Sequence, residues 1–259
     1  MERQEPEVPM IVKKRWFLDF KPEEIEIIRQ NRETVVVVDL WAATTNIVLM
    51  LAKKPQRLIL VSDDKFPEAE KVYPQSVLIG QSKVIPEEKF ASSSNKSSDV
   101  DKVDIAGKVV LYVTFNGTRV LEAFSSNEKG LIFAGSMTNL EALVLRLRGL
   151  SPSKVNVVAS GNLTGEMGGV VFIEDFLGAE IIEKKLKGQE LDFQAAAEMM
   201  KQEMLKYYPA DLEEAEDKVW PYIFGQQTNI LPTAFINNEG FVEAVRPFGY
   251  TQGHWLRSG

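Results

Sequence analysis

Two polar features of this chain could carry chemistry, because each follows a run of β-prone apolar residues. Asp39 follows Val35–Val38, and the tetrad Asn116-Gly-Thr-Arg119 comes shortly after Val109–Val113. The start of a helix offers free backbone N–H groups to an anion, and the fork of an adjacent Arg matches phosphate oxygens. The tetrad therefore predicts an anion-binding turn between a strand and a helix.

Both features also have purely structural interpretations. Asn116 can cap a helix, Gly117 permits a tight turn, and Arg119 can simply lie in solvent. Asp39 can likewise cap the helix that follows it. What favours a functional role for Asp39 is its position, because ligands of open parallel sheets bind outside the carboxyl ends of the strands.

Buried strands that alternate with helices are needed to bring such residues together. Nearly unbroken apolar runs such as Val109–Val113 are typical of strands covered on both faces, as in parallel sheets. Strand and helix patterns alternate from Val35 to Leu186. We therefore predict an α/β fold, a three-layer α/β/α sandwich with a largely parallel sheet. The expected strands are Met10–Phe17, Val35–Val38, Arg57–Val61, Ser76–Ile79, Val109–Val113, Gly130–Ala134, Lys154–Ala159 and Gly240–Val245.

The strand-turn-helix pattern at Val35–Thr45 resembles the one at Val109–Arg119, which indicates a duplication. The domains that we predict are a single α/β domain over 1–259, two similar halves at about 30–106 and 107–190, and a helical C-terminal part at 191–259. The segment Gln81–Ala106 is rich in Ser and has little periodicity, so a long surface loop is expected there.

The composition restricts the chemistry. The chain has no cysteine and a single histidine, His254. Thiolate nucleophiles, disulfides, Cys-ligated zinc and iron–sulfur clusters are thereby excluded, and His-centred triads or metal sites are disfavoured. Carboxylate, hydroxyl, amide and cationic side chains must carry any catalysis, and carboxylate oxygens favour a hard metal such as magnesium.

The charge and the N-terminus bear on partners and location. A net charge of −7 disfavours binding to nucleic acid or to an anionic membrane, so any positive field for an anion must be local. The first residues are acidic and lead into no apolar segment, which argues against a signal peptide. No run reaches membrane-spanning length. We therefore expect a cytoplasmic protein.

Five segments together resemble a known family over about Val35–Leu186. They read Val-Val-Val-Val-Asp39-Leu-Trp-Ala-Ala-Thr-Thr45, Asn116-Gly-Thr-Arg119, Ala134-Gly-Ser-Met-Thr-Asn139, Ala159-Ser-Gly161 and Glu174-Asp175-x-x-Gly178-Ala179. In order and spacing these segments resemble the 2-phosphosulfolactate phosphatase family. The resemblance implies a magnesium-dependent hydrolase that removes phosphate from 2-phospho-3-sulfolactate, on the route to sulfolactate and, in methanogens, to coenzyme M.

The resemblance also implies residue roles. Asp39 and Arg119 would be catalytic, and Asp39 with Glu174 or Asp175 would hold Mg²⁺. Neighbours on a helix point in different directions, so only one of Glu174 and Asp175 is expected to face the site. The residues expected to bind substrate are Asn116, Gly117, Thr118, Thr44, Thr45, Asn139 and Gly161. The expected partner is a small anionic phosphorylated substrate, and a homodimer stays open.

Three positions depart from the family pattern. Ala42 replaces an Arg, and Gln81 and Ser82 stand where the family has Glu and Arg. Two hypotheses therefore stay open. One is an active phosphatase. The other is a catalytically weak or inactive homologue that binds an anionic metabolite or a protein partner.

Overall fold

A nine-stranded sheet lies at the centre of the computed structural model, which describes residues 10–126, 131–163, 172–207, 219–225 and 228–246. The strands lie in the order β1-β7-β2-β6-β8-β9-β3-β5-β4. Their bounds are β1 Ile11–Trp16, β2 Thr34–Val38, β3 Arg57–Val61, β4 Val77–Gly80, β5 Val109–Val113, β6 Ile132–Gly135, β7 Lys154–Ala159, β8 Thr233–Ile236 and β9 Val242–Val245. Every residue of β2 is buried, as a strand with both faces covered requires.

Two groups of parallel strands make up this sheet, and they run in opposite directions. Strands β1, β7, β2 and β6 are parallel to one another, and so are β3, β5 and β4. The antiparallel hairpin of β8 and β9 lies between the groups, with β8 antiparallel to β6 and β9 antiparallel to β3. Three antiparallel pairings in succession reverse the strand direction between the groups.

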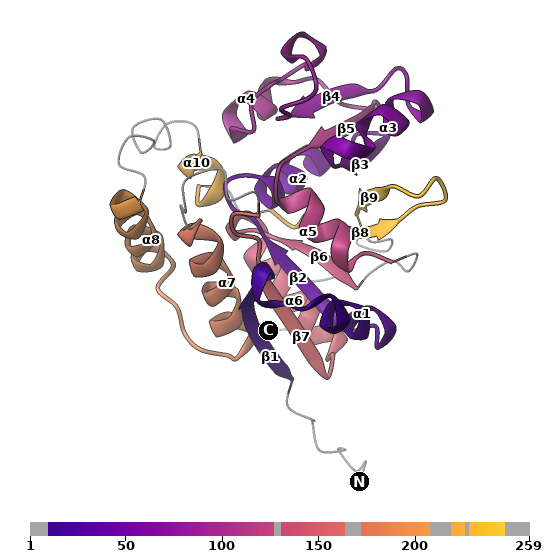
Figure 1. The fold of residues 1–259 in the computed structure, drawn as a ribbon. Coiled ribbons are helices and arrows are strands. Elements are labelled where there is room, and N and C mark those ends of the chain that lie inside the picture. The colour runs from indigo at the N-terminus through magenta and orange to yellow at the C-terminus, as the bar shows by residue number, and fades with distance from the viewer. Residues whose placement is uncertain (1–9, 127–130, 164–171, 208–218, 226–227, 247–259) are drawn as a thin grey trace, which may run out of the picture.

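The carboxyl ends of β2 and β5 nevertheless open onto the same region (Figure 1). Neighbouring strands rotate by roughly 20–25° because L-residues give strands a right-handed twist. The path from β2 to β5 crosses four intervening strands, so the accumulated rotation reaches roughly 100°. Helix α5 (Gly117–Phe124) follows β5 and yet packs against β2. The twist thus lets residues from both parallel groups meet.

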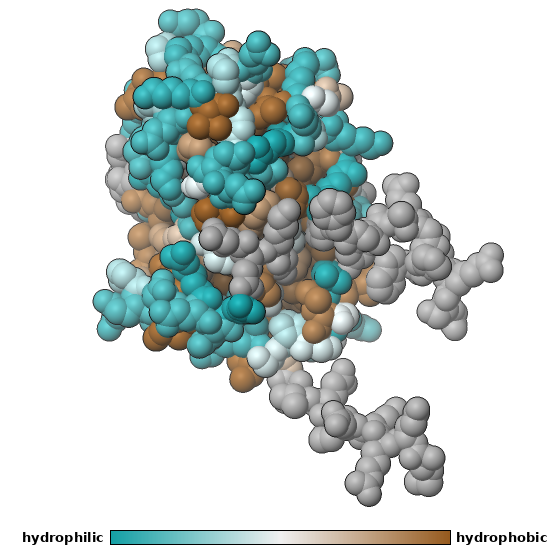
Figure 2. Space-filling model, turned by 90° about the vertical axis from the view of Figure 1, so that its right-hand side faces the viewer, coloured by the Kyte–Doolittle hydropathy of each residue, from teal (hydrophilic) through white to brown (hydrophobic). Residues whose placement is uncertain are grey.

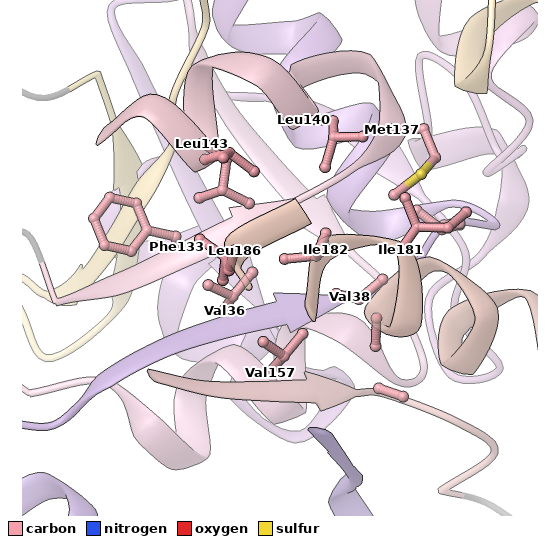
Figure 3. Close-up of a cluster of buried hydrophobic side chains, with 14 of the residues drawn as sticks. Val36, Val38, Phe133, Met137, Leu140, Leu143, Val157, Ile181, Ile182 and Leu186 are labelled. Atoms are coloured by element: carbon pink, nitrogen blue, oxygen red, sulfur yellow. The ribbon is translucent and has the colours of Figure 1, made fainter. Parts of the chain in front are cut away.

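Helices cover both faces of the sheet, so the predicted three-layer α/β/α architecture is confirmed. Val36 and Val38 of β2 pack toward α6, α7 and α8, whereas Val35 and Val37 pack toward α1, α2 and α5. Figure 3 shows the first cluster, with Val36 and Val38 facing side chains of α6 and α7. The remaining helix bounds are α1 Pro22–Gln30, α2 Ala43–Ala52, α3 Phe66–Val72, α4 Ser97–Lys102, α6 Leu140–Leu150, α7 Ile173–Leu186, α8 Phe193–Tyr207 and α10 Trp220–Ile223.

Local patterns located most elements correctly. The expected strands Arg57–Val61 and Lys154–Ala159 coincide with β3 and β7. The expected long loop Gln81–Ala106 is more ordered than predicted, because it contains a 3-10 turn at Glu87–Lys89 and the helix α4. The predicted glycine-rich loop beyond Gly161 lies largely outside the described residues.

The sheet does not follow the predicted division of the chain into halves at 30–106 and 107–190. Strand β5 of the second range lies between β3 and β4 of the first, and β2 of the first lies between β7 and β6 of the second. The range 191–259 contains the helices α8 and α10 and also supplies β8 and β9, of which β9 matches the expected strand Gly240–Val245. These strands pair with partners far away in sequence, which local periodicity does not reveal.

The described surface is mixed in character. On the face drawn in Figure 2, hydrophilic residues surround smaller hydrophobic areas. Several large apolar side chains stay exposed, among them Ile11, Leu18, Ile27 and Leu145. Among the described residues, no helix combines the length and apolarity that crossing a membrane requires.

Candidate active site

Asp39 is held at the end of β2 by the first turn of the helix that follows. The Ala43 N–H donates to Asp39 Oδ1 at 3.0 Å, and the Thr44 N–H donates to the Asp39 carbonyl oxygen at 2.9 Å. The Thr44 hydroxyl donates to the same carbonyl and accepts from the Asp39 N–H. Asp39 is buried and serves the N-terminus of α2, as its structural interpretation predicts.

Gly117 brings a second helix N-terminus to the Asp39 carboxylate. From the first position of α5, its backbone N–H acts on this carboxylate and opposes the rise in the pKa of Asp39. A Cβ atom at Gly117 would lie 2.7 Å from Asp39 Oδ2 and 2.4 Å from the Ala43 Cβ, so a larger residue requires movement. The carboxylate therefore lies at the starts of both α2 and α5, where the helix dipoles favour negative charge.

Asp175, in the first turn of α7, ties together the ends of two neighbouring strands. Its Oδ1 accepts the Leu40 N–H at 2.8 Å, just after β2, and its Oδ2 accepts the Gly161 N–H at 3.0 Å, just after β7. Both carboxylate oxygens thus have backbone partners. Asp175 positions the loops that surround Asp39 and has less capacity left to bind a metal ion.

The buried carboxyl groups influence one another's protonation. Burial raises the pKa of Asp39, while the N–H groups of Ala43 and Gly117 oppose that rise. Burial also raises the pKa of Asp175 well above its usual range, and the negative charges of Asp39 and Glu174 act in the same direction. Since close carboxylates resist ionising together, this arrangement favours negative charge on Asp39 over Asp175.

Two residues after β7 complete the surroundings of Asp39. Gly161 has a φ of +69°, a left-handed conformation that glycine adopts without strain. The Ser160 hydroxyl is fully buried and acts on the Asp39 carboxyl. Within the described residues, however, this hydroxyl has no hydrogen bond of standard geometry. It is the buried hydroxyl with bonding capacity left beside Asp39.

Asn116 joins the two parallel groups of strands. Its Oδ1 accepts the Leu163 N–H at 3.1 Å, which links the turn after β5 to the loop after β7. Hydrogen bonds therefore connect segments that follow β2, β5 and β7. The predicted residues that they bring together are Asp39, Asn116, Gly117, Gly161 and Asp175.

Other predicted substrate-binding groups already have internal partners. The Thr118 N–H donates to Thr114 Oγ1 at 3.1 Å. We expected this amide to bind an anion, but the internal hydrogen bond already occupies it. The Thr45 hydroxyl bonds Leu40 O and Ser136 Oγ. Asn139 Oδ1 accepts from the Ser136 N–H, and its Nδ2 donates to Ala134 O. These buried side chains, like that of Thr44, hold the turns that follow β2, β5 and β6.

The backbone of Arg119 lies two residues beyond Gly117, but its side chain is exposed. Its charge helps to lower the pKa of Asp64, together with a hydrogen bond from the Ser62 hydroxyl, which is the larger effect. The predicted grip of the Arg119 fork on a phosphoryl group beside Asp39 therefore stays a prediction. It requires the long side chain to turn toward the carboxylate.

The carboxylates do not form a three-ligand metal site. Across the described ranges, no cluster of three or more Asp, Glu or His side chains has the arrangement to hold an ion. Glu174 and Asp175 are both buried at the start of α7. A magnesium ion held by one or two carboxylates, water and substrate oxygens fits this donor set better, because Mg²⁺ usually keeps several waters.

Asn46 is a buried polar residue near the site, and the sequence analysis did not identify it. Its Nδ2 donates to Asn95 O at 2.7 Å and to the Tyr112 hydroxyl at 3.0 Å. Burial raises the pKa of Tyr112, and the charge of Asp39 contributes to that rise. Asn46 thus fixes the loop around Asn95 to the interior beside Asp39. Its position directly after Thr44 and Thr45 was the available signal.

The fold and these contacts define an α/β protein with a carboxylate-centred site, built where parallel strands end and two helices begin. A family model described as 2-phosphosulpholactate phosphatase matches residues 19–218, and the chain belongs to this family. The resemblance inferred from the motifs is thereby confirmed.

Curated relatives agree with this family. A protein of Thermotoga petrophila named probable 2-phosphosulfolactate phosphatase is 34% identical over 158 residues, covering 61% of this chain and 64% of the relative. A protein of Thermoplasma acidophilum with the same name is 30% identical over 161 residues, covering 62% of this chain and 68% of the relative. The matched region thus spans about two thirds of the length of each relative.

Proposed function

We propose that this chain is a phosphomonoesterase whose reactive centre is the carboxylate of Asp39. The observation that carries the proposal is the contact of this one carboxylate with the N-termini of both α2 and α5. Helix N-termini bind phosphate and stabilise the negative charge of a phosphoryl group during transfer. A phosphoryl group placed beside Asp39 would lie in a field that favours its transition state.

Asp39 has two alternative roles in this proposal. It can accept a proton from a water molecule that attacks phosphorus while the alcohol leaves. It can also attack phosphorus directly, and water would then hydrolyse the aspartyl phosphate. In either case Gly117 and Ala43 orient the carboxylate, and Ser160 is the buried hydroxyl beside it.

Magnesium is part of the proposal. Asp39 would hold the ion, with Glu174 as the second carboxylate, because both oxygens of Asp175 accept backbone N–H groups. When bound, the ion would neutralise charge on the phosphoryl oxygens. Arg119 would supply a further positive charge once its side chain turns inward from the first turn of α5.

The proposed substrate is a small phosphorylated hydroxy acid. The names of the relatives make 2-phosphosulfolactate, which would give sulfolactate, the first compound to test. Such a substrate would place the reaction on a route like that to coenzyme M, in the cytoplasm. A homodimer is compatible with the proposal and is not required by it.

A second candidate function is a weakly active or inactive homologue that binds an anionic metabolite or a protein partner. The observation in its favour is the absence of charge at Ala42, Gln81 and Ser82. Ala42 is buried, and the Ser82 hydroxyl accepts the N–H groups of Val84 and Ile85. These positions therefore serve the local structure.

Phosphate release from 2-phosphosulfolactate by the purified protein, with Mg²⁺ and with a chelator, separates the two candidates. We expect turnover that the chelator abolishes and that Asp39→Asn lowers by roughly a hundredfold or more. The control is Asp19→Asn, the same change at an exposed position. Full activity of Asp39→Asn would contradict the proposal. A ligand-induced thermal shift without phosphate release would support the binding protein.

A further inference from the structure

A cavity of about 300 Å³ lies beside the candidate active site, between the turn after β4 and the end of β5. The residues that line it include Gln81 and Ser82, just after β4, and Phe115, just after β5. Phe115 is two residues from Gly117, whose N–H reaches the Asp39 carboxylate. Because consecutive Cα atoms lie 3.8 Å apart, the Phe115 Cα is within roughly 8 Å of the Gly117 Cα.

A further lining segment is anchored to the interior near Asp39. Ser93 lines the cavity, and Asn95 in the same segment accepts a hydrogen bond from the buried Asn46 side chain. Asn46 also donates to the Tyr112 hydroxyl, on which the Asp39 charge acts. The lining segments that contain Phe115 and Ser93 are therefore both joined to elements near Asp39.

Among the described residues that line the cavity, none carries a positive charge. Glu87 is the one charged side chain of this set, and the others are neutral or apolar, including Gln81, Ser82, Phe90 and Phe115. The Lys83 amine lies 5.7 Å from the centre of the Phe115 ring, and Lys83 is not among the described residues that line the cavity. An anionic group entering here would lose water and meet a carboxylate.

A 2-phosphorylated hydroxy acid carries a phosphate, a carboxylate and a third group on the same carbon atom. We infer that this cavity receives the third group and that it selects a third group without charge. A hydroxymethyl group can bond Gln81, Ser82 or Glu87, and a methyl group can pack on Phe90 and Phe115. A sulfonate finds no cation among the described residues of the lining. The inference rests on the proposed phosphatase function and narrows its substrate to esters with an uncharged side group.

Three phosphate esters that differ only in this third group test the inference. They are 2-phosphoglycerate with a hydroxymethyl group, 2-phospholactate with a methyl group and 2-phosphosulfolactate with a sulfomethyl group. The unmodified protein should hydrolyse the uncharged esters with a kcat/KM at least about tenfold above that of the sulfonate, which corresponds to about 1.4 kcal/mol. Equal or faster hydrolysis of the sulfonate would overturn the inference and leave the proposed function intact.

A pair of variants locates the effect in the cavity. Glu87→Gln removes the charge but keeps an oxygen that can accept the Ser93 hydroxyl, so kcat/KM for the sulfonate should rise about three- to tenfold. Glu88→Gln is the matched control, because Glu88 is the next residue of the same 3-10 turn and does not line this cavity. The same response in both variants would contradict the inference.

Binding measurements keep the inference testable if no ester is hydrolysed. That outcome would refute the proposed function alone. Calorimetric titration of the same three esters should then give a Kd for 2-phosphoglycerate at least about tenfold below that for 2-phosphosulfolactate, with the difference reduced in Glu87→Gln. Equal affinities in the unmodified protein would overturn the inference.

Discussion

Gly117 lies so close to the carboxylate of Asp39 that a Cβ atom on it would be 2.7 Å from Asp39 Oδ2, and this contact joins the two parallel groups of strands at the candidate active site. One residue follows β2 and the other follows β5, which run in opposite directions within the sheet. Because the contact depends on the missing side chain of Gly117, it offers a direct structural test.

Gly117→Ala should destabilise the protein by roughly 1–3 kcal/mol, because its Cβ would press on Asp39 and Ala43 in a packed interior. Phosphate release should fall as well. The free energy of unfolding in urea measures the first effect. Gly149→Ala is the control: no atom lies near its new Cβ in α6, so stability should stay or rise by up to about 1 kcal/mol. Equal stability of the two variants would contradict the prediction.

Asp175→Asn should cost roughly 1–3 kcal/mol, because an amide NH₂ group would face one of the N–H groups of Leu40 and Gly161. The measurement is again urea unfolding, now as a function of pH. A carboxyl group with a higher pKa in the folded chain binds more protons there than in the unfolded chain. Stability therefore falls as the pH rises from about 3.8 through the folded pKa.

The variant should lack the part of this decline that Asp175 contributes. Asp19→Asn, at an exposed position, should keep the full pH dependence. An unchanged decline in Asp175→Asn, measured without added metal, would mean that Asp175 is not the group that holds the proton.

Asn46→Leu should destabilise the protein by about 1–3 kcal/mol for each partner left without its hydrogen bond, since Asn95 O and the Tyr112 hydroxyl lose their donor. The KM for substrate should rise because the loop around Asn95 loses its anchor. Gln30→Leu removes a surface hydrogen bond and should change stability by less than about 0.5 kcal/mol. A KM unchanged in Asn46→Leu would separate this loop from substrate binding.

Arg119→Lys should lower kcat/KM by about tenfold, because lysine keeps the charge and loses the bidentate fork. Folding should be unaffected, since the side chain is exposed. Steady-state kinetics and thermal unfolding measure both quantities, and Arg29→Lys in α1 is the control. Wild-type kinetics in Arg119→Lys would show that the Arg119 side chain stays exposed during the reaction and does not bind the phosphoryl group.

Local chemistry predicted the elements better than their arrangement. The apolar run Val35–Val38 and the strand Lys154–Ala159 were predictable because burial on both faces leaves a direct mark on residue type. The placement of β8 and β9 between the parallel groups could not be predicted from local patterns, because the pairing of Thr233–Ile236 with β6 depends on hydrogen bonds between distant segments.

The meeting of Asp39 and Gly161 was predictable from the rule that parallel strands end at one edge, because β2 and β7 are parallel neighbours. The approach of Asn116 was not predictable from this rule, because β5 runs in the opposite direction. The sequence did not allow us to predict which backbone amides remain free to bind a ligand. The N–H of Thr118 is taken by Thr114, and that of Gly161 by Asp175, and such choices depend on side-chain geometry that spacing does not encode.

The place of the β8–β9 hairpin has a consequence for how the chain is made. Thr233–Ile236 and Val242–Val245 are synthesised after all the other strands of the sheet, yet they lie in its middle. On the ribosome, β6 and β3 would each present an unpaired edge until the hairpin emerges. Such edges invite pairing with other chains. Nascent chains that stall before residue 233 should therefore depend most on chaperones, although nearly all residues of the candidate active site have already been translated.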